Sequence, residues 1–142
     1  MYYNDAKPDK IFYQGMALLK LAETARTADE RDRLKGQAHG RFYKLINYGK
    51  QHLFDKVVMD YFAVSLPDLL IWEDSLDRKN LIHCKYMLAL GYYGMGDRER
   101  ALRYLEEVEA LDRNHQGIQQ LRSLLEMTQI AEKLFWNMVQ KY

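Results

Sequence analysis

The sequence predicts an all-α fold, and three observations support that prediction. Helix-breaking residues are scarce, since Pro8 and Pro67 are the only prolines among 142 residues. Leu, Ala, Glu, Lys, Arg and Met, which favour helices, are abundant. No segment shows the sustained alternation of apolar and polar residues, bounded by turn residues, that is typical of a β-strand. We therefore expect one helical domain over residues 1–142.

The N-terminal part predicts two helices separated by a charged run. Pro8 suits a first helical turn, where the missing N–H of proline is not needed. The run 23–36 mixes charges of both signs, so we expect a solvent-exposed helix extension or a loop. Gly49 is a possible end of the second helix. Apolar residues recur at helical spacing on both sides of the charged run: Ile11, Phe12, Gly15, Met16, Leu18, Leu19 and Ala22 before it, and Ala38, Phe42, Leu45 and Ile46 after it.

The segment 53–77 is densely apolar and is interrupted by a proline. We expect a helix to about Val64 and a short helical turn that begins near Leu66. Asp77 or Asn80 is a suitable N-cap for the helix that follows. The segment has no place in a regular array of helices, so we expect it to be an irregular connector.

Residues 81–113 have the clearest sequence pattern in the chain and predict a helical hairpin. Gly96 and Asp97 separate two amphipathic stretches, because glycine suits the left-handed exit of one helix and aspartate suits the N-cap of the next. The apolar faces comprise Leu81, Cys84, Leu88, Gly91 and Tyr92, followed by Ala101, Leu105, Val108 and Leu111.

A long final helix is predicted over residues 115–141. We expect it to cover the open face of the preceding hairpin as a capping helix. Leu134 and Trp136 add apolar side chains outside its main face, which is more than a cap with a polar outer side needs. The main face carries Ile118, Leu121, Leu125, Thr128, Ala131, Phe135 and Met138.

The hairpin over 81–113 resembles a tetratricopeptide repeat (TPR), a family of helical hairpins about 34 residues long. It departs from the family pattern at Lys85, where the family usually has an aromatic residue, and at Arg113, where proline is usual. The matching residues are Leu88, Ala89, Tyr92, Gly96, Asp97, Ala101, Leu105, Val108, Leu111 and Asp112.

A degenerate copy of this repeat, with the charged run as an insertion, is identified over about 8–50. Its matching residues are Gly15, Leu18, Ala38, Phe42 and Leu45. The resemblance implies a TPR-like α-α superhelix of antiparallel helical hairpins that ends in a long capping helix. The arrangement is also similar to the C-terminal helical-repeat part of larger bacterial proteins that carry a β-rich domain upstream.

Composition argues against several function classes. The net charge of +1 provides no strong field for nucleic acid or for an anionic membrane. Cys84 is the only cysteine, so neither an internal disulfide nor a multi-cysteine metal site is expected. No signal-peptide pattern is visible, and the apolar runs are too short to span a bilayer. We expect a cytoplasmic protein without nucleic-acid or membrane partners.

Patterns typical of catalysis are not found. The sequence contains no glycine-rich phosphate loop, no His-Glu-x-x-His and no nucleophile elbow. Cys84 lies on an apolar face and is interpreted as a small buried hydrophobe. We therefore expect no enzyme activity, no metal and no cofactor. Four scattered histidines, His39, His52, His83 and His115, are interpreted as surface or hydrogen-bonded side chains, and Asp68, Glu73, Asp74 and Asp77 as helix caps or solvated carboxylates.

The resemblance implies a binding surface, because in TPR proteins the first helix of each hairpin lines a concave face that usually binds peptides. The family's clamp for a C-terminal carboxylate needs Lys, Arg and Asn on this face. Here the matching positions hold Phe12, Met16, Tyr86 and Leu90, so we expect that clamp to be absent. The candidate partner-binding residues are Phe12, Met16, Leu19, His83, Tyr86, Leu90 and Tyr93.

A competing interpretation is that the connector fills this hollow through Tyr61, Phe62 and Trp72, leaving no space for a ligand.

Three functions follow from these observations. The leading one is a non-enzymatic module that contacts a protein or peptide, another domain of a parent protein, or a second copy of itself. The second is an accessory tail of a larger, carbohydrate-active bacterial enzyme, with Trp72 and Tyr93 shaping a cleft. The third is a stand-alone hydrolase that uses Asp68, Glu73 and His83.

Overall fold

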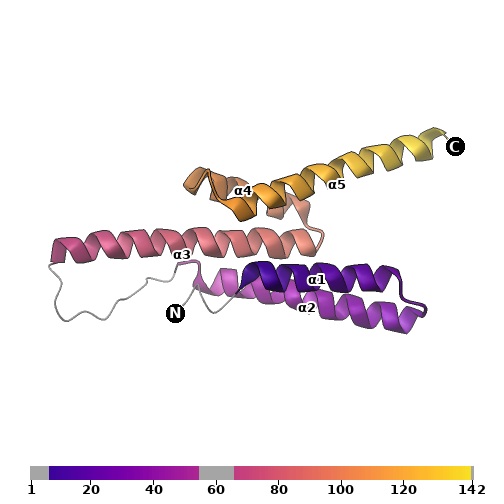
Figure 1. Ribbon diagram of the computed structural model, residues 1–142, viewed down its shortest axis with the longest axis horizontal. Coiled ribbons are helices and arrows are strands. Elements are labelled where there is room, and N and C mark those ends of the chain that lie inside the picture. Colours follow the sequence, from indigo (N-terminus) through magenta and orange to yellow (C-terminus); the bar gives the residue numbers. More distant parts are fainter. Residues whose placement is uncertain (1–6, 55–65, 142) are drawn as a thin grey trace.

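The computed structural model describes residues 7–54 and 66–141, with side chains over 7–54 and 77–141. These residues are almost entirely helical and contain no strand, so the all-α prediction is confirmed (Figure 1). The helices are α1 (Pro8–Glu23), α2 (Ala28–His52), α3 (Leu66–Gly94), α4 (Arg98–Leu111) and α5 (Gln116–Lys141). None of the described helices is long and apolar enough to cross a membrane.

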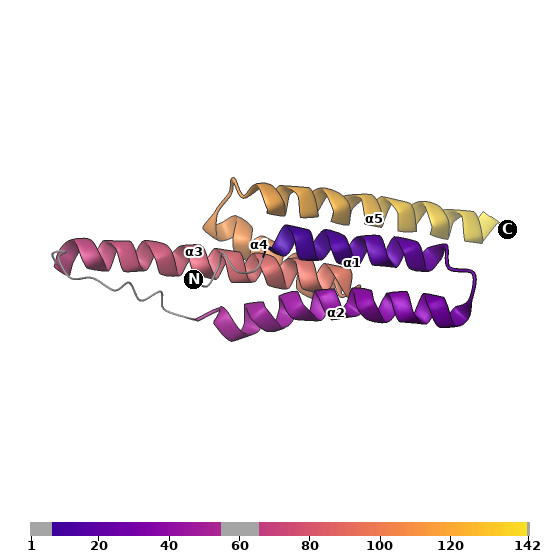
Figure 2. The ribbon, with the colours of Figure 1, turned by 60° about the horizontal axis from the view of Figure 1, so that its bottom comes forward.

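The helices alternate in direction along the chain. α1, α3 and α5 run one way and α2 and α4 run the other, as Figures 1 and 2 both show. The short turns that join α1 to α2 and α3 to α4 enforce this antiparallel pairing within each hairpin. The described chain therefore forms two helical hairpins followed by a single unpaired helix.

The charged run between the first two helices is part turn and part helix. α1 ends at Glu23, and α2 already begins at Ala28. Thr27 is the N-cap of α2, because its hydroxyl accepts a hydrogen bond of 3.1 Å from the backbone N–H of Glu30. The glutamate three residues after this threonine gives the sequence pattern of a capping box. The charged residues that follow lie on an exposed helical surface.

The predicted break before Leu81 is wrong, because α3 runs without interruption from Leu66 to Gly94. Asn80, predicted as an N-cap, lies inside α3 and is fully buried. Its side-chain amide donates a hydrogen bond of 2.8 Å to the backbone carbonyl of His52, at the end of α2. Asn80 thus satisfies a carbonyl at the end of another helix, which accounts for a residue with cap preference inside a helix. The earlier part of the predicted connector, over 55–65, lies outside the described residues.

The turn between α3 and α4 is built as predicted. Gly96 has a φ of 83°, the left-handed conformation that favours glycine. Asp97 is the N-cap of α4, with a side-chain oxygen that accepts a hydrogen bond of 3.1 Å from the backbone N–H of Arg100. These two residues position the hairpin whose first helix lines the candidate site.

Glycines allow α2 and α3 to approach closely. A Cβ at Gly49 would lie 2.7 Å from Cγ of Leu88 and 2.9 Å from the backbone oxygen of Cys84. A Cβ at Gly91 would lie 2.6 Å from Cγ1 of Ile46. Since α2 continues to His52, Gly49 does not end the helix and serves this contact instead.

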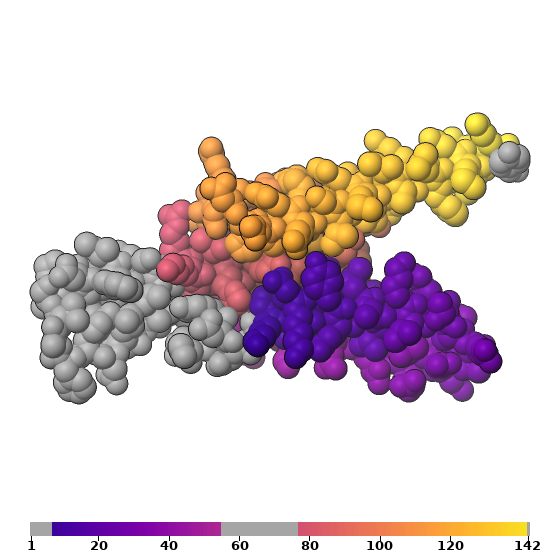
Figure 3. Space-filling view, viewed as in Figure 1, coloured from indigo at the N-terminus to yellow at the C-terminus, as the bar shows by residue number. Residues whose placement is uncertain are grey.

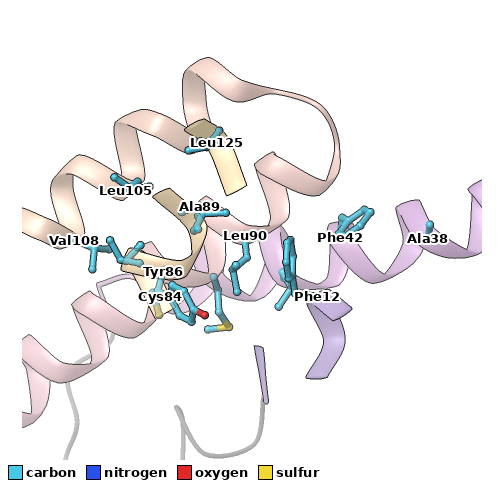
Figure 4. Close-up of a cluster of buried hydrophobic side chains, with 14 residues drawn as sticks. Phe12, Ala38, Phe42, Cys84, Tyr86, Ala89, Leu90, Leu105, Val108 and Leu125 are labelled. Carbon is cyan, nitrogen blue, oxygen red and sulfur yellow. The ribbon is translucent and has the colours of Figure 1, made fainter. Parts of the chain in front are cut away.

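The core lies where the two hairpins and the start of α5 meet (Figure 4). Ala89 and Ala101, the small residues expected at helix crossings, are both fully buried. Cys84 is also fully buried, as predicted. The largest buried side chains come from four helices: Phe42 and Leu45 from α2, Met87 and Leu88 from α3, Leu105 and Val108 from α4, and Ile118 and Leu121 from α5.

Candidate functional site

Three of the seven candidate binding residues belong to the core. Phe12, Tyr86 and Leu90 are each at most 5% exposed. The ring of Phe12 lies 6.2 Å from that of Phe42 and 6.0 Å from that of Tyr93, which places it between α1, α2 and α3. In this fold these three side chains hold the hairpins together and do not present a surface to a partner.

Tyr86 connects three helices. Its hydroxyl donates a hydrogen bond to Asp9 in the first turn of α1. Its ring packs 4.7 Å from the ring of His115, which precedes α5. Gly117 leaves room for this ring, because a Cβ there would overlap it. Burial, together with the hydrogen bond to Asp9, raises the pKa of Tyr86. The phenol is therefore a structural hydrogen-bond donor that fixes α1 and α5 against α3.

His83 lies beside this arrangement and is half-buried. Burial lowers the pKa of His83, and the nearby His115 lowers it further. Burial also lowers the pKa of His115. Nδ1 of His115 accepts a hydrogen bond of 3.2 Å from the backbone N–H of Ile118, so this histidine is the N-cap of α5. The lowered pKa values favour the neutral form of both histidines, and His115 has a structural role at the start of α5.

The other three candidates, Met16, Leu19 and Tyr93, line a groove of about 590 Å³. α1 forms one wall, α5 forms the other, and α3 contributes to the lining between them. The lining is mostly apolar, with charges from Lys20 and Glu23 of α1. The helix α5 supplies the remaining lining residues, which are Leu124, Met127, Thr128 and Ala131.

A hydrogen-bonded pair lies in this groove. The hydroxyls of Tyr93 and Thr128 are 3.1 Å apart, and the Thr128 hydroxyl is also 2.7 Å from the backbone carbonyl of Leu124. Because Thr128 has one hydroxyl proton and gives it to that carbonyl, Tyr93 donates to Thr128. Both hydroxyl protons are used in hydrogen bonds within the chain, so the groove presents mainly apolar surface to a ligand.

Ion pairs attach α5 to α4 at two points. Arg122 makes a two-pronged contact with Glu109, through hydrogen bonds of 2.7 Å and 2.6 Å. Further along α5, Glu132 pairs closely with Arg98 in the first turn of α4. The C-terminal half of α5 extends past the α3–α4 turn and points away from the rest of the molecule (Figure 1). Among the described residues, the ion pair of Glu132 with Arg98 holds the second half of α5 near its start.

Large apolar side chains cover this projecting part. Leu134 and Trp136 are each 61% exposed, and Phe135 is 67% exposed. The space-filling view shows the C-terminal half of α5 standing away from the α1–α2 hairpin, with an open wedge between them (Figure 3). A second hollow of about 590 Å³ borders α5 at Thr128, Ala131, Glu132, Phe135 and Trp136. Exposed apolar surface of this extent is typical of a contact site.

The wall supplied by α5 was not among the sequence candidates. The signal for it is present in the sequence as a second stripe on the final helix, Leu124, Met127, Ala131, Leu134 and Met138, at alternating spacings of three and four. In the sequence analysis, Ala131 and Met138 were placed on the capping face of the final helix and Leu134 was noted outside it, but these residues were not connected with Leu124 and Met127 into one stripe.

Most of the side chains assigned to the alternative functions lie outside the described residues. Tyr93, proposed to shape a carbohydrate cleft, lies in the groove, whereas the side chain of Trp72 lies outside the described residues. His83 packs near Tyr86, and the side chains of Asp68 and Glu73 also lie outside the described residues, as do Tyr61 and Phe62. Among the side chains that the structure describes, no cluster of His, Cys, Asp and Glu is suited to hold a metal ion.

The groove and the apolar face of α5 thus form the most developed candidate site in the described structure. Comparison with known proteins gives no further guide to it. The chain matches no family model and no solved structure.

Proposed function

We propose that this chain is a non-enzymatic protein-contact module of TPR type, which binds an apolar segment of a protein in the groove between α1, α3 and α5. A cytoplasmic location accords with this role. The observation that carries the proposal is that Met16, Leu19 and Tyr93, from the first helices of two hairpins, line a single groove with α5.

The arrangement of helices supports a TPR-type interpretation. α1, α3 and α5 run in the same direction, and α2 and α4 return between them (Figure 2). In a TPR superhelix the first helices of successive hairpins line the concave face. Here α5 takes the place of the first helix of a third hairpin, which gives the groove its second wall.

The chemistry of the groove favours an apolar protein segment as ligand. Met16 and Met127 offer flexible, polarisable side chains, which adapt to irregular apolar surfaces. The charges at the groove, Lys20 and Glu23, already pair with each other at 3.5 Å and leave no strong preference for either sign. An amphipathic helix laid in a groove of this kind uses anchors spaced three or four residues apart.

Site-specific photocrosslinking tests this proposal. A benzoylphenylalanine placed at Met127, in the groove, is expected to form adducts with another protein chain in an extract of the source cell. The matched control is the same group at Leu21, which is 55% exposed on α1 but does not line the groove. Adducts from Met127 alone support the proposal, whereas equal yields from both positions, or none from Met127, contradict it.

A further inference from the structure

The groove side of α5 carries a regular heptad pattern. Leu124, Ala131 and Met138 are seven residues apart, and Met127 and Leu134 lie between them. These are the a and d positions of a coiled coil, where two helices pack side chains into each other's gaps. The e and g positions beside them hold Phe135 and Ile130, which are 67% and 58% exposed. The pattern extends for the whole length of α5 that leaves the bundle.

The core of the chain uses only the first residue of this heptad face, Leu124, which is partly buried against it. Ile118, Leu121 and Leu125, which are at most 6% exposed, form the neighbouring face of α5, which is buried in the core. The heptad side chains Met127, Leu134 and Met138 are 61–66% exposed. α5 therefore has one apolar face packed within the chain and a second one that, from Met127 onward, stays largely exposed in the described structure.

We propose that this heptad face is covered by α5 of a second copy of the chain, in an antiparallel pair. The inference rests on the proposed function and names the partner at the same site. In the register that centres the pair between Glu132 and Lys133, each a position faces a d position of the other copy. Ala131 then lies opposite Leu134 and Met127 opposite Met138, so a small residue meets a large one at the centre and two flexible residues meet on each side of it. Lys141 lies opposite Leu124 at the outer ends of the pair.

Charge favours the antiparallel orientation. Lys141 occupies the last d position of the heptad face. An antiparallel pair keeps the two copies of Lys141 at opposite ends of the interface, whereas a parallel pair would place them together. The dipoles of two antiparallel helices point in opposite directions, and their interaction also favours the antiparallel orientation.

The available area is sufficient for a specific dimer. Five heptad-face side chains, Met127, Ile130, Leu134, Phe135 and Met138, are 58–67% exposed. Covering them buries about 600 Å² per copy, or about 1,200 Å² in total, which reaches the lower bound of stable specific interfaces. The wedge beside the C-terminal half of α5 leaves this face open to an approaching helix (Figure 3).

Sedimentation equilibrium of the purified full chain, from about 5 to about 500 µM, tests the proposal. The wild-type chain is expected to pass from monomer to dimer across this range. Leu134→Glu is expected to raise the dimer Kd by roughly a hundredfold, because each dimer loses two leucine contacts and gains two charges at the interface. Leu21→Glu, which places the same charge at a comparably exposed leucine outside the groove, is expected to leave Kd unchanged.

A monomer at every concentration would overturn the second copy as partner. So would a dimer that Leu134→Glu and Leu21→Glu affect equally. Circular dichroism of each variant shows whether it keeps the helical content of the wild type, and Leu134→Gln provides an uncharged variant with the same expected direction. The photocrosslinking experiment separates the two proposals: adducts from Met127 to a different protein, with a purified chain that stays monomeric, would remove the homodimer and retain the proposed function.

Discussion

The two halves of α5 carry apolar residues at the same helical spacing, yet they meet different surroundings. In the first half, Leu121 is 1% exposed and packs in the core. In the second half, Leu134 is 61% exposed, on a segment that leaves the bundle. Helical periodicity therefore identifies a face that requires cover, but it does not say whether the cover comes from the same chain.

Leu121→Ala is expected to have the largest effect on stability. Truncating a buried leucine removes its apolar contacts and leaves a cavity, which costs about 3 kcal/mol of the free energy of unfolding. Urea denaturation of the variant and the wild type measures this difference. A loss below about 1 kcal/mol would show that the first half of α5 is not packed as described.

Gly117→Val tests how closely the first turn of α5 approaches α3. The added side chain would overlap the ring of Tyr86, which is held by its hydrogen bond to Asp9. We expect a loss of about 2 kcal/mol, since the ring is fixed and the helix must shift. The additional variant Tyr86→Ala should remove most of the penalty, and a double-mutant cycle by urea denaturation measures that coupling. Additive losses would contradict this contact.

The stability of the folded state should also depend on pH, because two histidines lie near the start of α5. The folded state lowers the pKa of both His83 and His115 from the ordinary 6.5, so the unfolded chain binds protons more readily below that pH. Stability is then complete above about pH 6.5 and is lost as the pH falls through 6.5 towards the folded-state pKa values. Thermal melting between pH 5 and pH 8 measures this, and a flat profile would argue against it.

His115→Asn provides the matched control for that titration. Asparagine is a good N-cap and does not titrate in this range, so it keeps the cap of α5 and removes one of the two histidines. The expected result is a shallower fall in stability below pH 6.5 than in the wild type. An unchanged slope would assign the whole effect to other groups.

Glu132→Gln is expected to have a small effect at the boundary between the two halves. The Glu132–Arg98 pair is largely exposed, and exposed ion pairs contribute about 0.5 kcal/mol or less. Hydrogen exchange of α5 amides gives a more sensitive measure, with faster exchange expected after Glu132 and little change before it. Equal acceleration throughout α5 would show that the two halves are not separately anchored.

Leu134→Ala should have the smallest effect on the stability of the monomer. At a chain concentration below the dimer Kd, little contact is lost, and we expect a change within about 0.5 kcal/mol. Leu121→Ala is the same substitution on the buried face of the first half of α5. The difference between the two losses of stability is therefore the sharpest form of the comparison. A cost near that of Leu121→Ala would mean that the chain itself covers the second half.

Much of the fold could be predicted from residues whose role is local. Gly96 and Asp97 specify a turn through their own backbone and side-chain preferences, and they form it as expected. Asn80 misled the prediction because its hydrogen bond goes to His52, on another helix, and such a partner leaves no local trace in the sequence. Turns and caps formed by neighbouring residues could therefore be predicted from the sequence. Hydrogen bonds between residues far apart in the sequence could not.

The candidate site shows the same division. Met16, Leu19 and Tyr93 were predicted as surface residues of first helices and line the groove. Phe12 and Tyr86 were predicted in the same way but are covered, because Phe12 packs against Phe42 of α2 and Tyr93 of α3, and α1 and α5 pack over Tyr86. Which aromatic side chains of a helix stay open depends on where its neighbours lie, and helical spacing within one element cannot determine this.

The most direct test of the central claim, that a second α5 covers the projecting half, is a distance between spin labels in the assembled protein. Lys133→Cys and Gln140→Cys, each in a Cys84→Ala background, place labels at exposed positions seven residues apart and thus at the same angle on the helix. In the antiparallel register the two labels at 133 are nearly level along the helix axis, while those at 140 are offset by about 22 Å. Double electron–electron resonance should therefore give a distance at 140 that is longer by on the order of 10 Å. Equal distances at the two positions, or no dipolar coupling at concentrations up to about 500 µM, would contradict the account.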